Sequence, residues 1–165
     1  MKVAQFAIAI CIIFSACATP KVENLEETDK GELKLILIKS QNIKFYDFGI
    51  LRTTPNISLE VFKLGKSIGR FTIEEKQICF NDDCAPKWPA SRSFFGNVSY
   101  DTLLEEILLK KDIFEGRGKE LGEDETIIQK FSYGNENIYY ERGTKRIYFK
   151  NLTNGVTISI ENYEQ

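Results

Sequence analysis

Alternation of apolar and polar residues dominates the chain from Leu33 onward. Short runs rich in Ile, Val, Phe and Tyr are separated by Gly, Asn, Asp or Pro, which is typical of β-strands joined by turns. One run places Ile57, Leu59 and Val61 on one face of a strand and Ser58 on the other. The pattern predicts strands at residues 33–39, 43–52, 57–63, 67–74, 77–80, 127–133, 137–142, 145–150 and 156–162.

The turns between these strands favour an antiparallel sheet. Arg142-Gly143-Thr144 separates two of the predicted strands, and Asn154-Gly155 precedes the last one. Connections this short join neighbouring strands, so we expect a hairpin meander at the C-terminal end. Alternating strands of this kind usually have one solvated face and one covered face.

One segment, residues 99–111, departs from the strand pattern and predicts the main α-helix. Lys110 and Lys111 at its end suit the C-terminal dipole of a helix. An amphipathic helix must cover an apolar surface, which is either the open side of a partial barrel or an ordinary core. Its apolar residues recur at helical spacing: Tyr100, Leu103, Leu104, Ile107 and Leu108.

The N-terminus predicts an export signal. Met1 and Lys2 precede an apolar run that ends at Phe14, which is shorter than the roughly 20 residues a membrane-spanning helix needs. We therefore expect residues 1–16 to be a signal peptide that is cleaved. Residues 18–32 are polar and lack a sustained apolar period, and they predict a flexible tether before a single domain at 33–165.

Cys17 is the predicted site of lipidation. Phe14-Ser15-Ala16-Cys17 resembles the bacterial lipobox, although an aliphatic residue is usual where Phe14 stands. Ordinary signal cleavage is the alternative. Acyl chains on Cys17 would anchor the protein to a membrane, since each buried methylene contributes about 0.8 kcal/mol. By the sorting rule of enterobacterial lipoproteins, Ala18 implies the outer membrane.

Composition narrows the classes of function. The chain has 22 basic and 24 acidic residues, a formal net charge of -2, so we expect no nucleic-acid partner. It contains no His, which excludes the Ser-His-Asp and Cys-His nucleophile systems and His-based zinc sites. We expect no enzyme activity, no cofactor and no metal site.

Cys79 and Cys84 predict a local disulfide. They enclose Phe80-Asn81-Asp82-Asp83, and exported proteins meet an oxidising compartment. A redox pair or a metal site that recruits the aspartates is the weaker alternative.

The segment 57–80 carries the strongest functional signal. An apolar strand, a tight Leu64-Gly65 turn and a second strand follow one another, with Lys63 and Lys66 beside the turn. A Leu at a turn tip either folds back on the sheet or faces water, where it is available for binding. This pattern, together with the helical segment 99–121 and the closing strand of 154–165, resembles the LolB family. LolB proteins are outer-membrane lipoprotein receptors of the lipoprotein localisation system.

The resemblance implies a fold and a function. The fold would be an incomplete antiparallel β-barrel with a helical lid, mainly β with one main helix. The function would be to accept the acyl chains of lipoproteins from a LolA-like periplasmic carrier and insert them into the outer membrane, at its periplasmic face. Leu64 would protrude for membrane insertion, followed by Gly65. The family usually has Pro where this chain has Lys63, and the Cys79/Cys84 pair is no part of its pattern.

Alternation also selects the residues that would line the interior. The candidate cavity residues are Leu59, Val61, Phe71, Ile73, Phe131, Ile147, Phe149 and Ile158. We expect the protein to act as a monomer. The alternative is a structural or assembly lipoprotein of the envelope that binds a protein partner and whose own side chains fill the barrel.

Overall fold

The computed structural model describes residues 31–41 and 43–163. The predicted signal peptide, Cys17 and the tether up to residue 30 lie outside the described residues. The first strand begins at Glu32, one residue before the predicted start of the domain.

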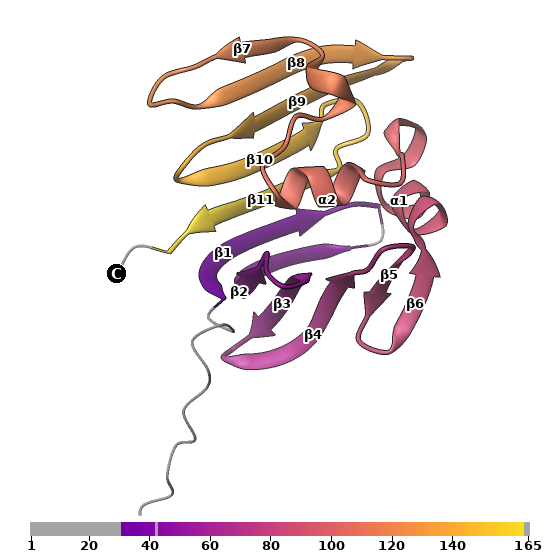
Figure 1. The fold of residues 1–165 in the computed structure, drawn as a ribbon, viewed down its shortest axis with the longest axis vertical. Helices are drawn as coiled ribbons and strands as arrows, with labels where there is room; N and C mark the ends of the chain where they lie inside the picture. Colours follow the sequence, from indigo (N-terminus) through magenta and orange to yellow (C-terminus); the bar gives the residue numbers. More distant parts are fainter. Residues whose placement is uncertain (1–30, 42, 164–165) are drawn as a thin grey trace, which may run out of the picture.

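One antiparallel sheet contains every strand of the described chain (Figure 1). The strands are β1 (Glu32–Lys39), β2 (Lys44–Arg52), β3 (Ile57–Lys63), β4 (Lys66–Ile73), β5 (Gln77–Phe80), β6 (Asp83–Pro86), β7 (Lys119–Leu121), β8 (Ile127–Tyr133), β9 (Glu136–Arg142), β10 (Arg146–Asn151) and β11 (Thr157–Asn162). Their order is β6-β5-β4-β3-β2-β1-β11-β10-β9-β8-β7. The sheet is therefore open, with β6 and β7 as its edges.

This sheet confirms the predicted mainly-β, antiparallel class. Neighbouring strands follow one another in sequence except where β1 pairs with β11, which joins the two halves of the chain. Two strands were not predicted, because β6 and β7 are short and their residues are mostly exposed. Neither strand has an apolar face that alternation could indicate.

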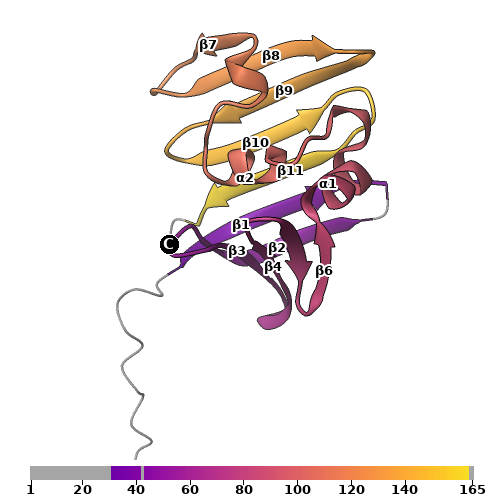
Figure 2. The ribbon, with the colours of Figure 1, turned by 45° about the vertical axis from the view of Figure 1, so that its right-hand side comes forward.

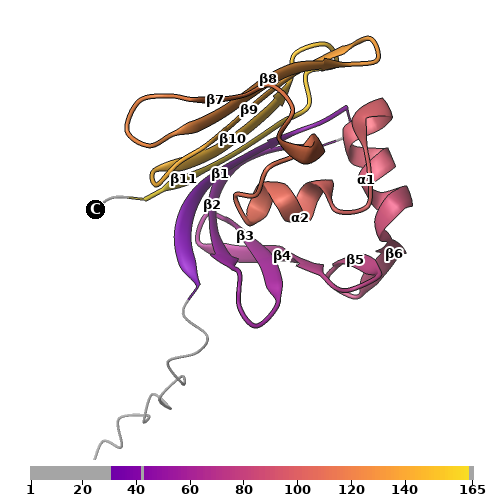
Figure 3. The same cartoon turned by 45° about the horizontal axis from the view of Figure 1, so that its top comes forward.

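The helical segments lie against the concave face of the sheet. They are α1 (Lys87–Phe95), α2 (Leu103–Leu108) and two 3₁₀ turns, Gly96–Val98 and Phe114–Gly116. Figures 2 and 3 show the sheet curling around α2, while α1 stands at the open side next to β6. The chain crosses from one half of the sheet to the other through these helices.

The predicted helix at 99–111 is wrong in its bounds, since α2 spans only Leu103–Leu108. Ser99 has extended backbone angles, and the Tyr100 ring packs edge-on against Phe114 with centroids 4.9 Å apart. At the other end of the helix, the Lys111 N–H donates to the Glu106 carbonyl. The Lys110 N–H donates to the Ile107 carbonyl. These two bonds form a Schellman motif, which ends the helix.

The longer helix, α1, was missed because its buried stripe is partly polar. Lys87, Ser91 and Phe95 occupy one stripe at a spacing of four and are buried. Lys87 Nζ lies 2.9 Å from Glu105 Oε2, and Ser91 Oγ donates to the Tyr100 carbonyl at 2.8 Å. Polar partners on α2 and on Tyr100, just before it, thus take the place of an apolar contact. Hydrophobic periodicity does not detect a helix of this kind.

The core lies between α2 and the concave face. Leu103 and Ile107 of α2 are fully buried, as are Ile36 of β1, Tyr140 of β9 and Phe149 of β10. At about 25 cal/mol per Å² of apolar area, burial of these large side chains is the main stabilising term of the fold.

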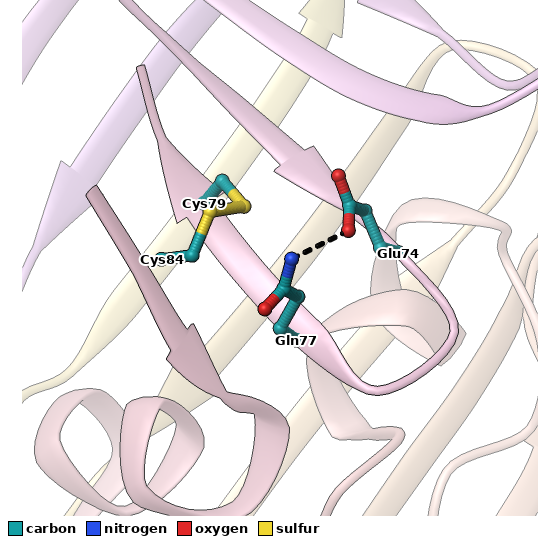
Figure 4. Close-up of a disulfide and its surroundings, with 4 residues drawn as sticks. All are labelled: Glu74, Gln77, Cys79 and Cys84. Carbon is teal, nitrogen blue, oxygen red and sulfur yellow. Dashed lines mark hydrogen bonds between the residues drawn. A yellow bond between two sulfur atoms is a disulfide. The ribbon is translucent and has the colours of Figure 1, made fainter. Parts of the chain in front are cut away.

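The predicted disulfide is formed. Cys79 of β5 and Cys84 of β6 face each other across the hairpin, and Gln77 donates to Glu74 at its open end (Figure 4). The bridge closes a short loop, so its contribution to stability is on the order of 2 kcal/mol at best. It fixes the edge of the sheet from which α1 departs.

Candidate functional site

An apolar cavity of about 380 Å³ lies between the sheet and the helices. Strands β1, β3, β4, β5, β6 and β11 contribute to one wall, and α1 and α2 form the other. This volume falls in the range of roughly 300–1,000 Å³ that is usual for small-molecule sites. Its apolar lining residues include Leu59, Phe71, Ile78, Phe94, Leu104 and Ile158.

The chemistry of the cavity suits a hydrocarbon ligand. Among the described residues that line it none is charged, and the polar ones are Ser40, Ser91 and Ser93. The Ser91 hydroxyl is already bonded to a carbonyl. A ligand in the cavity would gain free energy from leaving water, with few directed contacts to fix a particular head group.

Three of the eight candidate cavity residues line this space: Leu59, Phe71 and Ile158. Ile147 lines a different, polar pocket on the other side of Leu108. The remaining four line neither pocket. Val61, Ile73 and Phe149 are buried, and Phe131 packs against the Phe114 ring at 5.0 Å.

Sequence reasoning missed the part of the cavity wall that α1 forms, whereas Leu104 and Leu108 of α2 belong to the predicted apolar stripe. Pro89, Ala90 and Phe94 of α1 line the cavity, and they lie in a segment for which no helix was predicted. The available signal was the spacing of Lys87, Ser91 and Phe95, which becomes informative only when buried polar residues are accepted as part of a helical stripe.

Hydrogen bonds and aromatic packing hold α2 against the 3₁₀ turn Phe114–Gly116. The Tyr100 hydroxyl donates to Glu106 and accepts a hydrogen bond from the Phe114 N–H at 3.1 Å. Burial and the bond to Glu106 raise the pKa of Tyr100 far above its usual value, so the phenol stays protonated. This junction ties α2 to the 3₁₀ turn that follows it.

Leu64 stands at the tip of the β3–β4 hairpin and is 90% exposed. Its neighbours in the turn, Lys63, Gly65 and Lys66, are also exposed. An apolar tip flanked by lysines matches the chemistry of a bilayer surface, where the apolar group enters the acyl region and the cations meet anionic headgroups.

The backbone of this tip is unfavourable for leucine. Leu64 has φ +50° and Gly65 has φ +76°. Two consecutive residues with positive φ form the type I′ turn of two-residue hairpins, in which Asn-Gly is preferred. A leucine in this conformation costs on the order of 1 kcal/mol. Leu64 therefore lowers stability through its backbone, and its exposed side chain gains no compensating burial energy.

No family model, curated protein or solved structure matches the chain. The resemblance to the LolB family therefore rests on the motifs given above. Over residues 31–41 and 43–163, no helix is long and apolar enough to cross a membrane. Over the same residues, no group of three or more Cys, Asp or Glu side chains is placed to hold a metal ion.

We predict that Leu64→Asn stabilises the protein by about 1 kcal/mol, because asparagine tolerates the left-handed conformation. Denaturant-induced unfolding monitored by circular dichroism measures the change. Leu121→Asn is the matched control, since Leu121 is 79% exposed but lies in the edge strand β7 without a positive φ. Destabilisation by Leu64→Asn would contradict the account of the turn.

Proposed function

We propose that this protein is a membrane-anchored lipoprotein receptor that takes acyl chains into the apolar cavity. In the full form of the proposal, Cys17 carries the lipid anchor at the periplasmic face of the outer membrane. A soluble LolA-like carrier delivers lipoproteins, and the receptor passes their acyl chains to the bilayer. No covalent step is required.

The observation that carries the proposal is the uncharged, apolar cavity under α1. Each methylene group that moves from water into such a space contributes about 0.8 kcal/mol. The bilayer offers the same gain to each buried methylene group. Transfer of the buried part of an acyl chain between cavity and membrane is therefore close to balanced in free energy. A partial cavity is therefore better suited to handing a chain onward than to storing it.

The exposed hairpin tip supports the second half of the proposal. Leu64 has a backbone conformation that lowers stability and a side chain that no burial compensates. Such local costs are typical of residues that act in binding. Insertion of Leu64 into the acyl region would bring the receptor against the bilayer, while Lys63 and Lys66 contact the headgroups.

A structural lipoprotein that binds only a protein partner is the alternative. In that case the interior would be filled by the chain's own side chains. The cavity of about 380 Å³ supports the receptor over this alternative, because well-packed interiors rarely leave a space of that size.

We predict that Ala90→Trp weakens binding of a fluorescent fatty acid at least tenfold. Ala90 is half-buried on α1 and lines the cavity, so a tryptophan there occupies the space of several methylene groups. Arg92→Trp is the matched control, because Arg92 is exposed on the same helix and does not line the cavity. Thermal unfolding shows whether each variant folds. Equal affinities of the folded Ala90→Trp and Arg92→Trp variants would overturn the assignment of the cavity.

We predict that Leu64→Glu leaves the fold and fatty-acid binding intact but blocks delivery of a lipoprotein to liposomes. A carboxylate at the tip cannot enter the acyl region without a large desolvation cost. Release of a labelled lipoprotein from its carrier into liposomes is the measurement. The control is Leu121→Glu, which adds the same charge at an exposed leucine in the edge strand β7. Undiminished delivery by Leu64→Glu would refute the role of the tip.

A further inference from the structure

A second pocket, of about 360 Å³, lies beyond the C-terminal end of α2. It is formed by the start of β1, the end of β2 with Thr53 and Thr54, the start of β10 and the end of β11. Leu108 lines both this pocket and the apolar cavity, so the two spaces are neighbours across α2. We call it the basic pocket, because its charged lining residues are Lys34, Arg52, Lys110, Arg146 and Glu32.

The charge balance of the basic pocket leaves a cationic excess. Arg52 pairs with Glu60, and Arg146 donates two hydrogen bonds to Glu141, and neither carboxylate lines the pocket. Among the described lining residues, what remains is the pair of lysines against the single carboxylate of Glu32. The pocket is thus suited to a group with one negative charge.

Lys34 is a built part of this pocket and not a surface charge. It is 5% exposed, on the concave side of β1. Its ammonium donates to Glu32 and, at 2.6 Å, to Asn162 Oδ1. An ammonium group has three N–H donors, so within residues 31–41 and 43–163 one has no partner beyond these two bonds. Burial of a charge is costly unless its donors find partners, which favours an anion in the pocket.

Lys110 occupies a position where the backbone favours glycine. It follows the C-cap of α2 in the Schellman motif and has φ +55°. It lines the pocket, and its Nζ donates to the carbonyl of Gly143, which is not a lining residue, at 2.8 Å. Burial, and secondly repulsion by the charge of Lys34, lower the pKa of Lys110, while the charge of Glu32 opposes this shift. An anion between them would relieve this repulsion.

We propose that the basic pocket binds a phosphodiester group. Its single negative charge matches the cationic excess, and its oxygens accept from the lysines and from the hydroxyls of Thr53 and Thr54. The group comes either from a phospholipid headgroup or from a soluble glycerophosphodiester. This inference is independent of the proposed acyl-chain function, because the phosphodiester contacts a different set of side chains.

Binding of glycerophosphoglycerol to the full-length protein, measured by isothermal titration calorimetry, tests the proposal. We expect saturable binding that weakens at high salt, and no binding of glycerol, which lacks the phosphate. Lys110→Gly should weaken it at least tenfold, since a hydrogen bond to a charged group is lost. Glycine adopts the required φ readily, so this variant should fold. Lys111→Gln is the matched control, because Lys111 is exposed and does not line the pocket.

A soluble short-chain lipid, dihexanoylphosphatidylglycerol, distinguishes the two sources of the group. Tighter binding than that of glycerophosphoglycerol identifies a lipid headgroup, and equal binding identifies a soluble diester; both outcomes support the site. Absence of saturable glycerophosphoglycerol binding, or equal affinity of wild type and Lys110→Gly, would overturn it. A positive result with the soluble diester stands even if fatty acids fail to bind, so failure of this site and failure of the acyl cavity are separable.

Discussion

The whole arrangement depends on one constraint: an open, curled antiparallel sheet leaves an apolar concave face that must be covered. The helical segment between β6 and β7 covers this face, and Leu103 and Ile107 of α2 are fully buried against it. A six-residue helix is too short to cover the whole face. The space toward β3–β5 is closed by α1 instead, and the imperfect fit between α1 and the sheet leaves the apolar cavity.

The two pockets and the hairpin tip follow from the same geometry. The cavity lies on one side of Leu108 and the basic pocket on the other, so α2 separates an apolar space from a cationic one. Leu64 stands on β3–β4, the hairpin that also supplies Leu59 and Phe71 to the cavity wall. An amphiphilic ligand and a bilayer surface are the partners that such a combination fits best. The proposed receptor function brings these features together in one account.

Much of the fold follows from local pattern. Alternation placed the main strands, and the spacing of Cys79 and Cys84 indicated the disulfide that the structure contains. The helix α1 was not predicted because its buried residues Lys87 and Ser91 are polar and bond to polar partners. Hydrophobic periodicity does not detect such residues as buried. Alternation also shows which residues share a face of a strand, but it does not show which element packs against that face. Leu59 and Val61 share a face of β3, yet only Leu59 lines the cavity, since packing of α1 over the sheet decides where space remains. The basic pocket combines residues from several separate parts of the sequence and has no local signature.

The most direct test of the account is the dependence of fatty-acid affinity on chain length, measured by displacement of a fluorescent probe. If the cavity holds an acyl chain, affinity should rise roughly fifteenfold for each two methylenes, which corresponds to about 1.6 kcal/mol, until the cavity is full. Beyond that length the affinity should level off, because further methylenes stay in water. Absence of binding, or an affinity that does not change with chain length, would contradict the central claim.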